Sequence, residues 1–219
     1  MPNVVKKKND SVCSQCRRAG EKLFLKGEKC FSPHCLLVRR NSIPGQHGSA
    51  KGMKRVTAYG MQLREKQKAK QIYGLRERQF SNYVATASKK TGNTADYLLK
   101  ALETRLDNVI FRLGFAKSRA MARQMVSHGH IFVNGKKVDI ASFKVAANST
   151  ISINPKKLES KKLYENFSQV FGKKDLPVWL ALEIEKDAKK IDGKVLGLPK
   201  LEEMTLEFDP KKIIEFYSR

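Results

Sequence analysis

All four cysteines of this chain lie near its amino terminus, at Cys13, Cys16, Cys30 and Cys35, and their spacing limits what this segment can become. The first pair reads C-x2-C and the second reads C-x4-C. A chain of 219 residues can bury a core without covalent staples, so these cysteines are not needed as general cross-links. A tetrahedral thiolate site takes two ligands from each of two tight turns, and we therefore expect both pairs to converge on one ion.

The amino-terminal sequence bears on whether these thiols stay reduced. MPNVVKKKND lacks the apolar region that follows the basic residues of a secretory signal. The chain also contains no run of about 18 apolar residues, the length that a membrane span requires. We therefore expect a soluble, cytoplasmic protein with no membrane partner. A reducing cytosol keeps thiols free, so the cysteines are better interpreted as metal ligands than as disulfides.

Zinc is the first choice for this set of ligands, and a 4Fe-4S cluster is the second, because both are held by four thiolates. Arg17, Arg18 and Lys29 lie near the cysteines and should favour thiolate over thiol. His34 could replace one thiolate, but four cysteines already complete the shell. Such a site would be structural, adding on the order of 10 kcal/mol to a segment with almost no core.

The charge of the chain points to a polyanionic partner. There are 44 Lys and Arg against 21 Asp and Glu, which gives a net charge of +23. Residues 1–92 hold 21 basic and 5 acidic side chains, whereas residues 154–219 hold 14 and 12. An excess this large would destabilise a lone fold by self-repulsion, and it attracts nucleic acid. The basic residues do not gather on one amphipathic face with aromatic anchors, so a membrane surface is a poorer match.

The amino-terminal half has an uneven pattern. Residues 1–48 show no long periodic element, whereas residues 61–91 predict two helices with a break near Gly74 and a stop at Gly92. The first of these helices is polar nearly all round, which suits contact with an anion. The phosphate contacts expected on it are Arg64, Lys66 and Lys68. Aromatic residues among the basic ones could stack on unpaired bases, although each is also spaced like a core residue: Tyr59, Tyr73, Phe80 and Tyr83.

The clearest pattern follows. Apolar residues recur at positions 98, 102, 106, 109 and 113, which predicts one amphipathic helix that Gly114 closes. Ser118 is expected to cap a second helix that ends at Gly129. Asn134-Gly135 predicts a tight hairpin within HIFVNGKKV, and TISI at 150–153 predicts a further strand. Together these elements make a small α/β unit.

The remaining sequence is less regular and carries no enzymatic motif. LPVWLALEI, which contains the single tryptophan, Trp179, is expected to form a short buried helix, and the terminal KKIIEFYSR a helix or strand. There is no phosphate-binding glycine loop and no zinc-protease helix. Asp107 is interpreted as a salt-bridge partner, and His128 and His130 as helix-end or anion contacts. We expect no enzyme and no small-molecule substrate.

Five stretches stand in a characteristic order: CSQCRRAGEKLFLKGEKCFSPHC, PGQHG, YGMQLREKQKAKQIYG, RLDNVIFRLGFAKSRAMARQMVSHGHIFVNGKKV and EFYSR. Over nearly its whole length the chain closely resembles bacterial small-subunit (30S) ribosomal proteins of the S4 family. The resemblance implies an α+β fold: a mainly helical domain interrupted by a small α/β RNA-binding module of two helices and short antiparallel strands. The implied parts are a metal knuckle at 1–48, the first helical part at 49–97, the inserted module at 98–172 and a completing segment at 173–219.

The resemblance also implies a function. Members of the family are structural constituents of the small ribosomal subunit and primary binders of 16S ribosomal RNA. They engage a junction in the 5′ domain, nucleate assembly of the subunit body and contribute to translational accuracy. The implied partners include the neighbouring small-subunit ribosomal protein number five and messenger RNA near the channel by which it enters. Position and charge give the RNA contacts expected on the module: Arg112, Lys117, Arg119, Arg123 and His130.

The chain departs from the family pattern at one turn, and two other functions compete. Where the family usually has Lys-Pro-Gly-Asp before the last strand of the module, this chain reads KVAANSTISI, so Asn148 must make the turn. Related modules are appended to pseudouridine synthases and to a tyrosyl-tRNA synthetase, but the segment left over here is too short for a catalytic domain. The alternative function is a zinc-dependent nucleic-acid-binding regulator outside the ribosome. No compact base-reading helix follows the cysteines, which argues against it.

Overall fold

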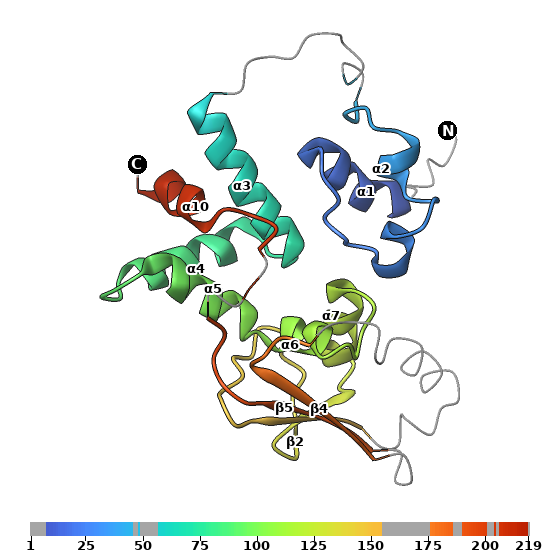
Figure 1. Cartoon of the computed structure of the whole chain (residues 1–219), viewed down its shortest axis with the longest axis vertical. Coiled ribbons are helices and arrows are strands. Elements are labelled where there is room, and N and C mark those ends of the chain that lie inside the picture. Colours follow the sequence, from blue (N-terminus) through green and yellow to red (C-terminus); the bar gives the residue numbers. More distant parts are fainter. Residues whose placement is uncertain are drawn as a thin grey trace, which may run out of the picture. The chain divides into compact units, whose positions relative to one another are not determined.

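The computed structural model describes residues 8–45, 48, 57–154, 176–185, 190–200, 204 and 206–218. Within these ranges the chain forms eight α-helices, one short 3-10 helix and a five-stranded sheet (Figure 1). The fold is therefore mixed α+β, as expected. The expected boundary between residues 172 and 173 lies outside the described residues. Among the described helices, none is both long enough and apolar enough to cross a bilayer.

The chain divides into two compact units. One unit combines Met1–Leu75 with Glu207–Arg219, and the other consists of Arg76–Leu206. The first unit is thus built from two segments that are far apart in the sequence. The second unit is a single continuous stretch.

The amino-terminal segment contains α1 (Lys8–Ala19), the 3-10 helix η1 (Gly27–Cys30) and the one-turn helix α2 (Leu36–Arg39). The expectation of no long periodic element before residue 48 is wrong, because α1 has 12 residues. Its sequence, KNDSVCSQCRRA, offers almost no apolar stripe, so the hydrophobic period that reveals most helices is missing. The helix ends at Gly20, whose φ of 77° suits a left-handed cap.

Helices α3 (Ala58–Ile72) and α10 (Pro210–Tyr217) pack together in the first unit. Most of the terminal KKIIEFYSR, which was expected to form a helix or a strand, lies in helix α10. Two hydrogen bonds join the helices across a long sequence separation: Gln62 Nε2 donates to Glu215 Oε2 at 2.9 Å, and the Asp209 backbone N–H donates to Glu65 Oε2 at 2.8 Å. These contacts explain why the carboxy-terminal residues belong to the amino-terminal unit.

The second unit begins with four helices, α4 (Glu77–Ser88), α5 (Thr94–Glu103), α6 (Leu106–Arg112) and α7 (Arg119–Ser127). The predicted break near Gly74 is confirmed, and the helix that was predicted to stop at Gly92 ends earlier, at Ser88. The prediction of one helix through residues 98–113 is wrong, because the chain leaves the helix at Thr104. There it pairs with a later segment: the Leu106 N–H donates to the Phe143 carbonyl and the Val145 N–H to the Thr104 carbonyl, each at 2.9 Å. This pairing interrupts the helix, although apolar residues continue to recur at helical spacing in the sequence.

The strands form one antiparallel sheet in the order β2-β1-β3-β5-β4. Their bounds are Ile131–Val133 (β1), Lys136–Lys137 (β2), Thr150–Ile153 (β3), Leu180–Glu185 (β4) and Lys190–Val195 (β5). The predicted hairpin is confirmed, with φ of 50° at Asn134 and 76° at Gly135. The turn before β3 is made by Asn148, as predicted, with φ of 62°.

Strand β4 corrects the prediction of a buried helix at LPVWLALEI. Its sequence places Leu180, Leu182 and Ile184 at every second position, which is the period of a strand, but an apolar run this short also matches a buried helix. Antiparallel pairing with β5 runs from Leu180 opposite Val195 to Glu185 opposite Lys190. Trp179 is buried just before the strand.

The core of this unit lies between the sheet and the helices α6 and α7, which cover one of its faces (Figure 1). It is formed by apolar residues that recur along these helices and strands with the periods predicted from the sequence, such as Leu106, Val126 and Ile151. The two layers approach closely at Gly193 in β5, where a Cβ would lie 2.5 Å from Leu113 Cδ1. A side chain at this position would have to displace the side chain of Leu113, which follows α6.

Candidate nucleic-acid interface

The four cysteines come from three different helical elements. Cys13 and Cys16 lie on α1, Cys30 ends η1 and Cys35 is the N-cap of α2. The first pair therefore shares one face of a helix, three residues apart, and does not come from a tight turn as expected. All four are free thiols. Three of them, Cys13, Cys30 and Cys35, line one cavity of about 380 Å³, and Cys16 is buried.

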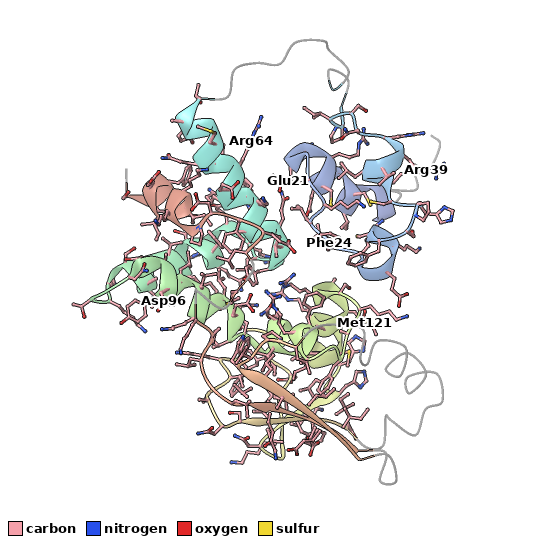
Figure 2. All side chains as sticks on the ribbon, in the orientation of Figure 1. Glu21, Phe24, Arg39, Arg64, Asp96 and Met121 are labelled. Carbon is pink, nitrogen blue, oxygen red and sulfur yellow. The ribbon has the colours of Figure 1, made fainter. Side chains whose placement is uncertain are left out.

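The turns around the cysteines are held by local contacts. The Lys26 backbone N–H donates to Cys30 Sγ at 3.4 Å, and Gly27 has a φ of 64°. The rings of Phe24 and Phe31 stack at a centroid distance of 4.8 Å, and Leu23 is buried. Figure 2 shows Phe24 in the loop between α1 and α2. The segment thus has a small apolar cluster beside the cysteines.

Two thiols of this cluster, those of Cys16 and Cys30, are favoured in their protonated form. Burial raises the pKa of Cys16 and of Cys30, and the neighbouring cysteine thiolates raise both further. The expectation that Arg17, Arg18 and Lys29 would favour thiolates at these positions is therefore wrong. Arg17 instead donates through Nε to the Ser42 carbonyl oxygen at 2.7 Å.

The four thiols match the ligands of zinc in kind and in number. Cys13, Cys30 and Cys35 line the same cavity, and Cys16 lies three residues from Cys13 on α1. They do not form a preassembled ligand shell, because the described residues include no group of three or more Cys, His, Asp or Glu side chains arranged to hold a metal ion. The cluster has the ligand atoms that zinc prefers, but its side chains are not arranged around one point as zinc ligands.

Helix α3 places its three predicted phosphate contacts in different surroundings. Arg64 is exposed and projects from the side of α3 away from α10 (Figure 2). Lys68 pairs with Glu21 at 2.5 Å. Lys66 is only 6% exposed, and its ammonium lies 4.5 Å from the ring centroid of Phe216. Residues two apart on a helix point in nearly opposite directions, which separates Lys66 from the other two.

Two buried carboxylates organise the arginines of the second unit. Glu103 is fully buried at the end of α5, and Arg112 donates to it twice, at 3.1 Å and 2.9 Å. Asn108 Nδ2 donates to the same carboxylate at 2.7 Å, and its Oδ1 accepts a hydrogen bond from Arg119 Nε at 2.8 Å. The Arg119 guanidinium also lies 4.5 Å from the centroid of Phe111. Arg112 and Arg119 are therefore held in one hydrogen-bonded chain.

Asp107 is the second of these carboxylates. Arg105 donates to it through Nε at 3.2 Å and Nη2 at 2.9 Å, so the salt bridge predicted for Asp107 is confirmed. Burial alone would lower the pKa of Arg105, but the hydrogen bond and charge of Asp107 outweigh it and leave the pKa raised. Arg123 Nε lies 3.9 Å from the same carboxylate. Three arginines thus lie against the two carboxylates, and the fourth, Arg119, is joined to Glu103 through Asn108. The four arginines exceed the carboxylates by two positive charges; we call Glu103, Asp107 and these four arginines the arginine cluster.

Two further predicted contacts flank this cluster. Lys117 lies in the turn between α6 and α7, and His130 follows α7 directly. The end of α7 is closed by Gly129, with φ of 68°, and the His130 backbone N–H donates to the Met125 carbonyl at 3.1 Å. The rings of His128 and His130 lie 5.9 Å apart. Ser118 Oγ accepts from the Met121 N–H at 3.3 Å, which confirms the predicted cap of α7.

Sequence reasoning missed Glu103, Arg105 and Asn108 as parts of this interface. A signal was present, because all three are polar residues within a strongly apolar period and so had to be buried with partners. Among the aromatic candidates for base stacking, Tyr73 and Phe80 are buried, Tyr59 is exposed, and Tyr83 is partly exposed. The Tyr83 hydroxyl accepts a hydrogen bond from Arg105 Nη1 at 2.7 Å.

Two family models match consecutive parts of the chain. Residues 7–103 match the model described as the Ribosomal protein S4/S9 N-terminal domain, and residues 104–151 match the S4 domain. The S4 match begins at the break between α5 and α6 and extends into β3. It therefore covers most of the arginine cluster.

Curated relatives align with the chain over almost its whole length. Small ribosomal subunit protein uS4 of Dictyoglomus turgidum is 51% identical over 207 residues, covering 94% of this chain and 96% of the relative. The corresponding protein of Thermus thermophilus is 48% identical, covering 95% and 97%. Small ribosomal subunit protein uS4A of Alkaliphilus metalliredigens is 47% identical, covering 96% and 98%. With this identity over nearly its full length, the chain belongs to the uS4 family of small ribosomal subunit proteins.

Proposed function

We propose that this chain is a non-catalytic structural constituent of the small ribosomal subunit and that it binds the ribosomal RNA of that subunit. The arginine cluster is the observation that carries this proposal. It places four guanidinium groups around two carboxylates on the unit that contains the S4 domain. Membership of the uS4 family supplies the identity of the RNA.

Preorganisation explains why such a cluster suits RNA. An arginine that is already held by a buried carboxylate loses less side-chain entropy when it binds a phosphate. The side chains of Arg112 and Arg123 remain 28% and 37% exposed while they make these contacts. Phosphate binding then releases counterions, which supplies affinity, while the fixed geometry selects the shape of the RNA.

The proposed RNA contacts are the residues expected from the sequence. On the module they are Arg112, Lys117, Arg119, Arg123 and His130, and on α3 they are Arg64, Lys66 and Lys68. Of the three proposed contacts on α3, Arg64 is the most exposed, which supports a direct phosphate contact. The buried ammonium of Lys66 is covered by Phe216, so its contribution to RNA binding would depend on the position of α10.

The finer parts of the function rest on the family relationship. We infer that the chain is a primary binder of 16S RNA at a junction of the 5′ domain and that it nucleates assembly of the subunit body. A contribution to translational accuracy follows from contact with ribosomal protein number five and with messenger RNA near the channel by which it enters. These functions place the protein in the cytoplasm, within the small subunit.

The proposed domain organisation is a mainly helical domain interrupted by the RNA-binding module. Its parts are residues 1–48, 49–97, 98–172 and 173–219. Support comes from the first compact unit, which joins Met1–Leu75 to the distant Glu207–Arg219. The second unit contains α4 and α5 together with the module.

We also propose that Cys13, Cys16, Cys30 and Cys35 hold a structural zinc ion, with a 4Fe-4S cluster as the alternative. The support is that Cys13, Cys30 and Cys35 line one cavity, and that Cys16, also a free thiol, lies three residues from Cys13 on the same helix. Elemental analysis and visible absorption of the purified, reduced protein test it. One zinc per chain without colour is expected, whereas iron with a brown chromophore would favour the cluster.

The salt dependence of RNA binding tests the proposed interface. The Arg123→Ala variant should weaken binding to a 5′-domain fragment of 16S RNA and reduce the slope of log K against log salt by about 0.7 to 0.9, the value for one lost phosphate contact. Lys194→Ala is the matched control, because it removes one exposed positive charge from β5 in the same unit. An unchanged slope in Arg123→Ala would remove this residue from the interface.

A further inference from the structure

A second cavity lies within the Arg76–Leu206 unit, and one residue of its lining, Arg105, also belongs to the arginine cluster. Its volume is about 360 Å³, within the range of roughly 300–1,000 Å³ that is usual for small-molecule sites. One wall is a face of α4, a second comes from α5, and the segment at residues 142–144 completes it. We call it the α4–α5 cavity. No residue assigned to phosphate binding above lines it.

The lining of the α4–α5 cavity is cationic and aromatic. Among the described residues that line it, Lys90, Arg105 and Lys144 are the ionisable groups apart from tyrosines, and none is a carboxylate. Tyr83 and Tyr97 supply two aromatic rings. Lys90 and Lys144 are both exposed, so their side chains can move to bring the ammonium groups against a ligand. A wall of this kind suits a ligand that combines a flat ring with a negative charge.

The polar wall is held in place by buried contacts. Arg105 is 1% exposed and is fixed by its two hydrogen bonds to Asp107. Its Nη1 donates to the Tyr83 hydroxyl at 2.7 Å. Because this oxygen already accepts a hydrogen bond from arginine, the Tyr83 hydroxyl proton is oriented away from Arg105 and can be donated to a ligand. Arg105 thus positions Tyr83.

Tyr97 is held on the opposite side. Its hydroxyl donates to the Thr91 carbonyl oxygen at 3.1 Å, and the Lys90 ammonium lies 5.1 Å from its ring centroid. Gly92 brings the backbone close to this ring, with φ of 121°. The ring and a cation are therefore neighbours at the wall, so both an aromatic base and a phosphate find a partner there.

We propose that the α4–α5 cavity binds one unstacked nucleotide, with the base against the tyrosine rings and the phosphate at Lys90 and Lys144. This inference rests on the proposed function, because ribosomal RNA is the source of the nucleotide that it implies. A free mononucleotide presents the same chemistry. The two sources are separated by experiment.

Titration of the full chain with adenosine and uridine 5′-monophosphates, followed by NMR or calorimetry, is the first test. Binding should be saturable, and inorganic phosphate alone should bind more weakly because it lacks a ring. Lys90→Ala should weaken nucleotide binding about tenfold, the loss expected for one charge-assisted hydrogen bond. Lys89→Ala is the matched control, since it removes a neighbouring exposed charge that does not line the cavity. Tyr83→Phe, which keeps the ring and removes the hydroxyl, should weaken binding severalfold.

The same variants are then measured with the 16S RNA fragment. If RNA is the source, the double variant Lys90→Ala/Lys144→Ala lowers the salt slope by about 1.5, for two phosphate contacts, while Lys89→Ala leaves it unchanged. If mononucleotides bind but the slope is unaffected, the cavity is a nucleotide site and RNA is excluded as its source. If no mononucleotide binds and RNA affinity is unchanged, the inference is overturned. The proposed function is tested separately, by Arg123→Ala and by the competition between 16S RNA and duplex DNA.

Discussion

Glu103 is the residue on which the proposed RNA interface depends most. It is fully buried at the end of α5, yet it carries a charge that Arg112 and Asn108 satisfy. A buried carboxylate of this kind is weak evidence for stability, because its desolvation offsets most of the gain from pairing. Its role is better described as positional, since it fixes the direction in which Arg112 faces.

Neutralising this residue should show its role. Glu103→Gln should lower the free energy of unfolding by about 3 kcal/mol, because it leaves the charge of Arg112 without its buried partner. Glu183→Gln is the control, because its pair with Lys194 is exposed and should contribute less than about 1 kcal/mol. Urea denaturation followed by the fluorescence of Trp179 measures both. Equal losses in the two variants would contradict a special role for Glu103.

Single residues were predictable from the sequence where their role depends on neighbouring residues alone. Ser118 as a cap and Asn134 and Asn148 as turn residues are such cases, because caps and turns depend on local backbone chemistry. The partners of the arginines were not predictable. Ion pairing such as that between Arg112 and Glu103, nine residues apart, depends on how two helices pack.

At the scale of elements, three mispredicted segments share one cause. Helix α1 lacks an apolar stripe, the helix through residue 104 is interrupted by pairing with residues 143–145, and β4 is a short apolar run that reads as either helix or strand. In each case, contacts with distant parts of the chain decide which of the locally possible secondary structures forms. The elements with strong periods and clear end signals, α7 and the β1–β2 hairpin, were predicted correctly.

The β1–β2 hairpin offers a test at this scale. Asn134 has a φ of 50°, and its Oδ1 accepts from the Thr150 backbone N–H at 2.8 Å, which joins the turn to β3. Asn134→Ala should lower the free energy of unfolding by about 2 kcal/mol, combining the left-handed strain with the lost hydrogen bond. Asn134→Gly removes the strain and should cost about half as much. A glycine variant as unstable as the alanine variant would show that backbone strain is not involved.

At the scale of the whole molecule, the two compact units should respond separately to metal removal. The proposed zinc site lies in the unit that contains Met1–Leu75, whereas Trp179 lies in the Arg76–Leu206 unit. Because the chain has a single tryptophan, its fluorescence reports on the second unit alone. Far-ultraviolet circular dichroism reports helices of both units.

A strong chelator should therefore reduce the helical signal of the first unit and leave the unfolding transition of Trp179 unchanged. The physical reason is that a structural metal contributes its binding free energy to the segment that holds it. A variant with all four cysteines replaced by serine should show no response to the chelator. A shift of the Trp179 transition in the natural chain would mean that the two units unfold together.

The central claim is that this chain selects folded ribosomal RNA and does not bind polyanions indiscriminately. The most direct test is competition for the full chain between the 5′-domain fragment of 16S RNA and duplex DNA of equal charge, at physiological salt. We expect the RNA to be preferred by at least about a hundredfold, because fixed guanidinium groups recognise RNA shape as well as charge. Equal affinity for the two would contradict the claim and favour a general nucleic-acid-binding role outside the ribosome.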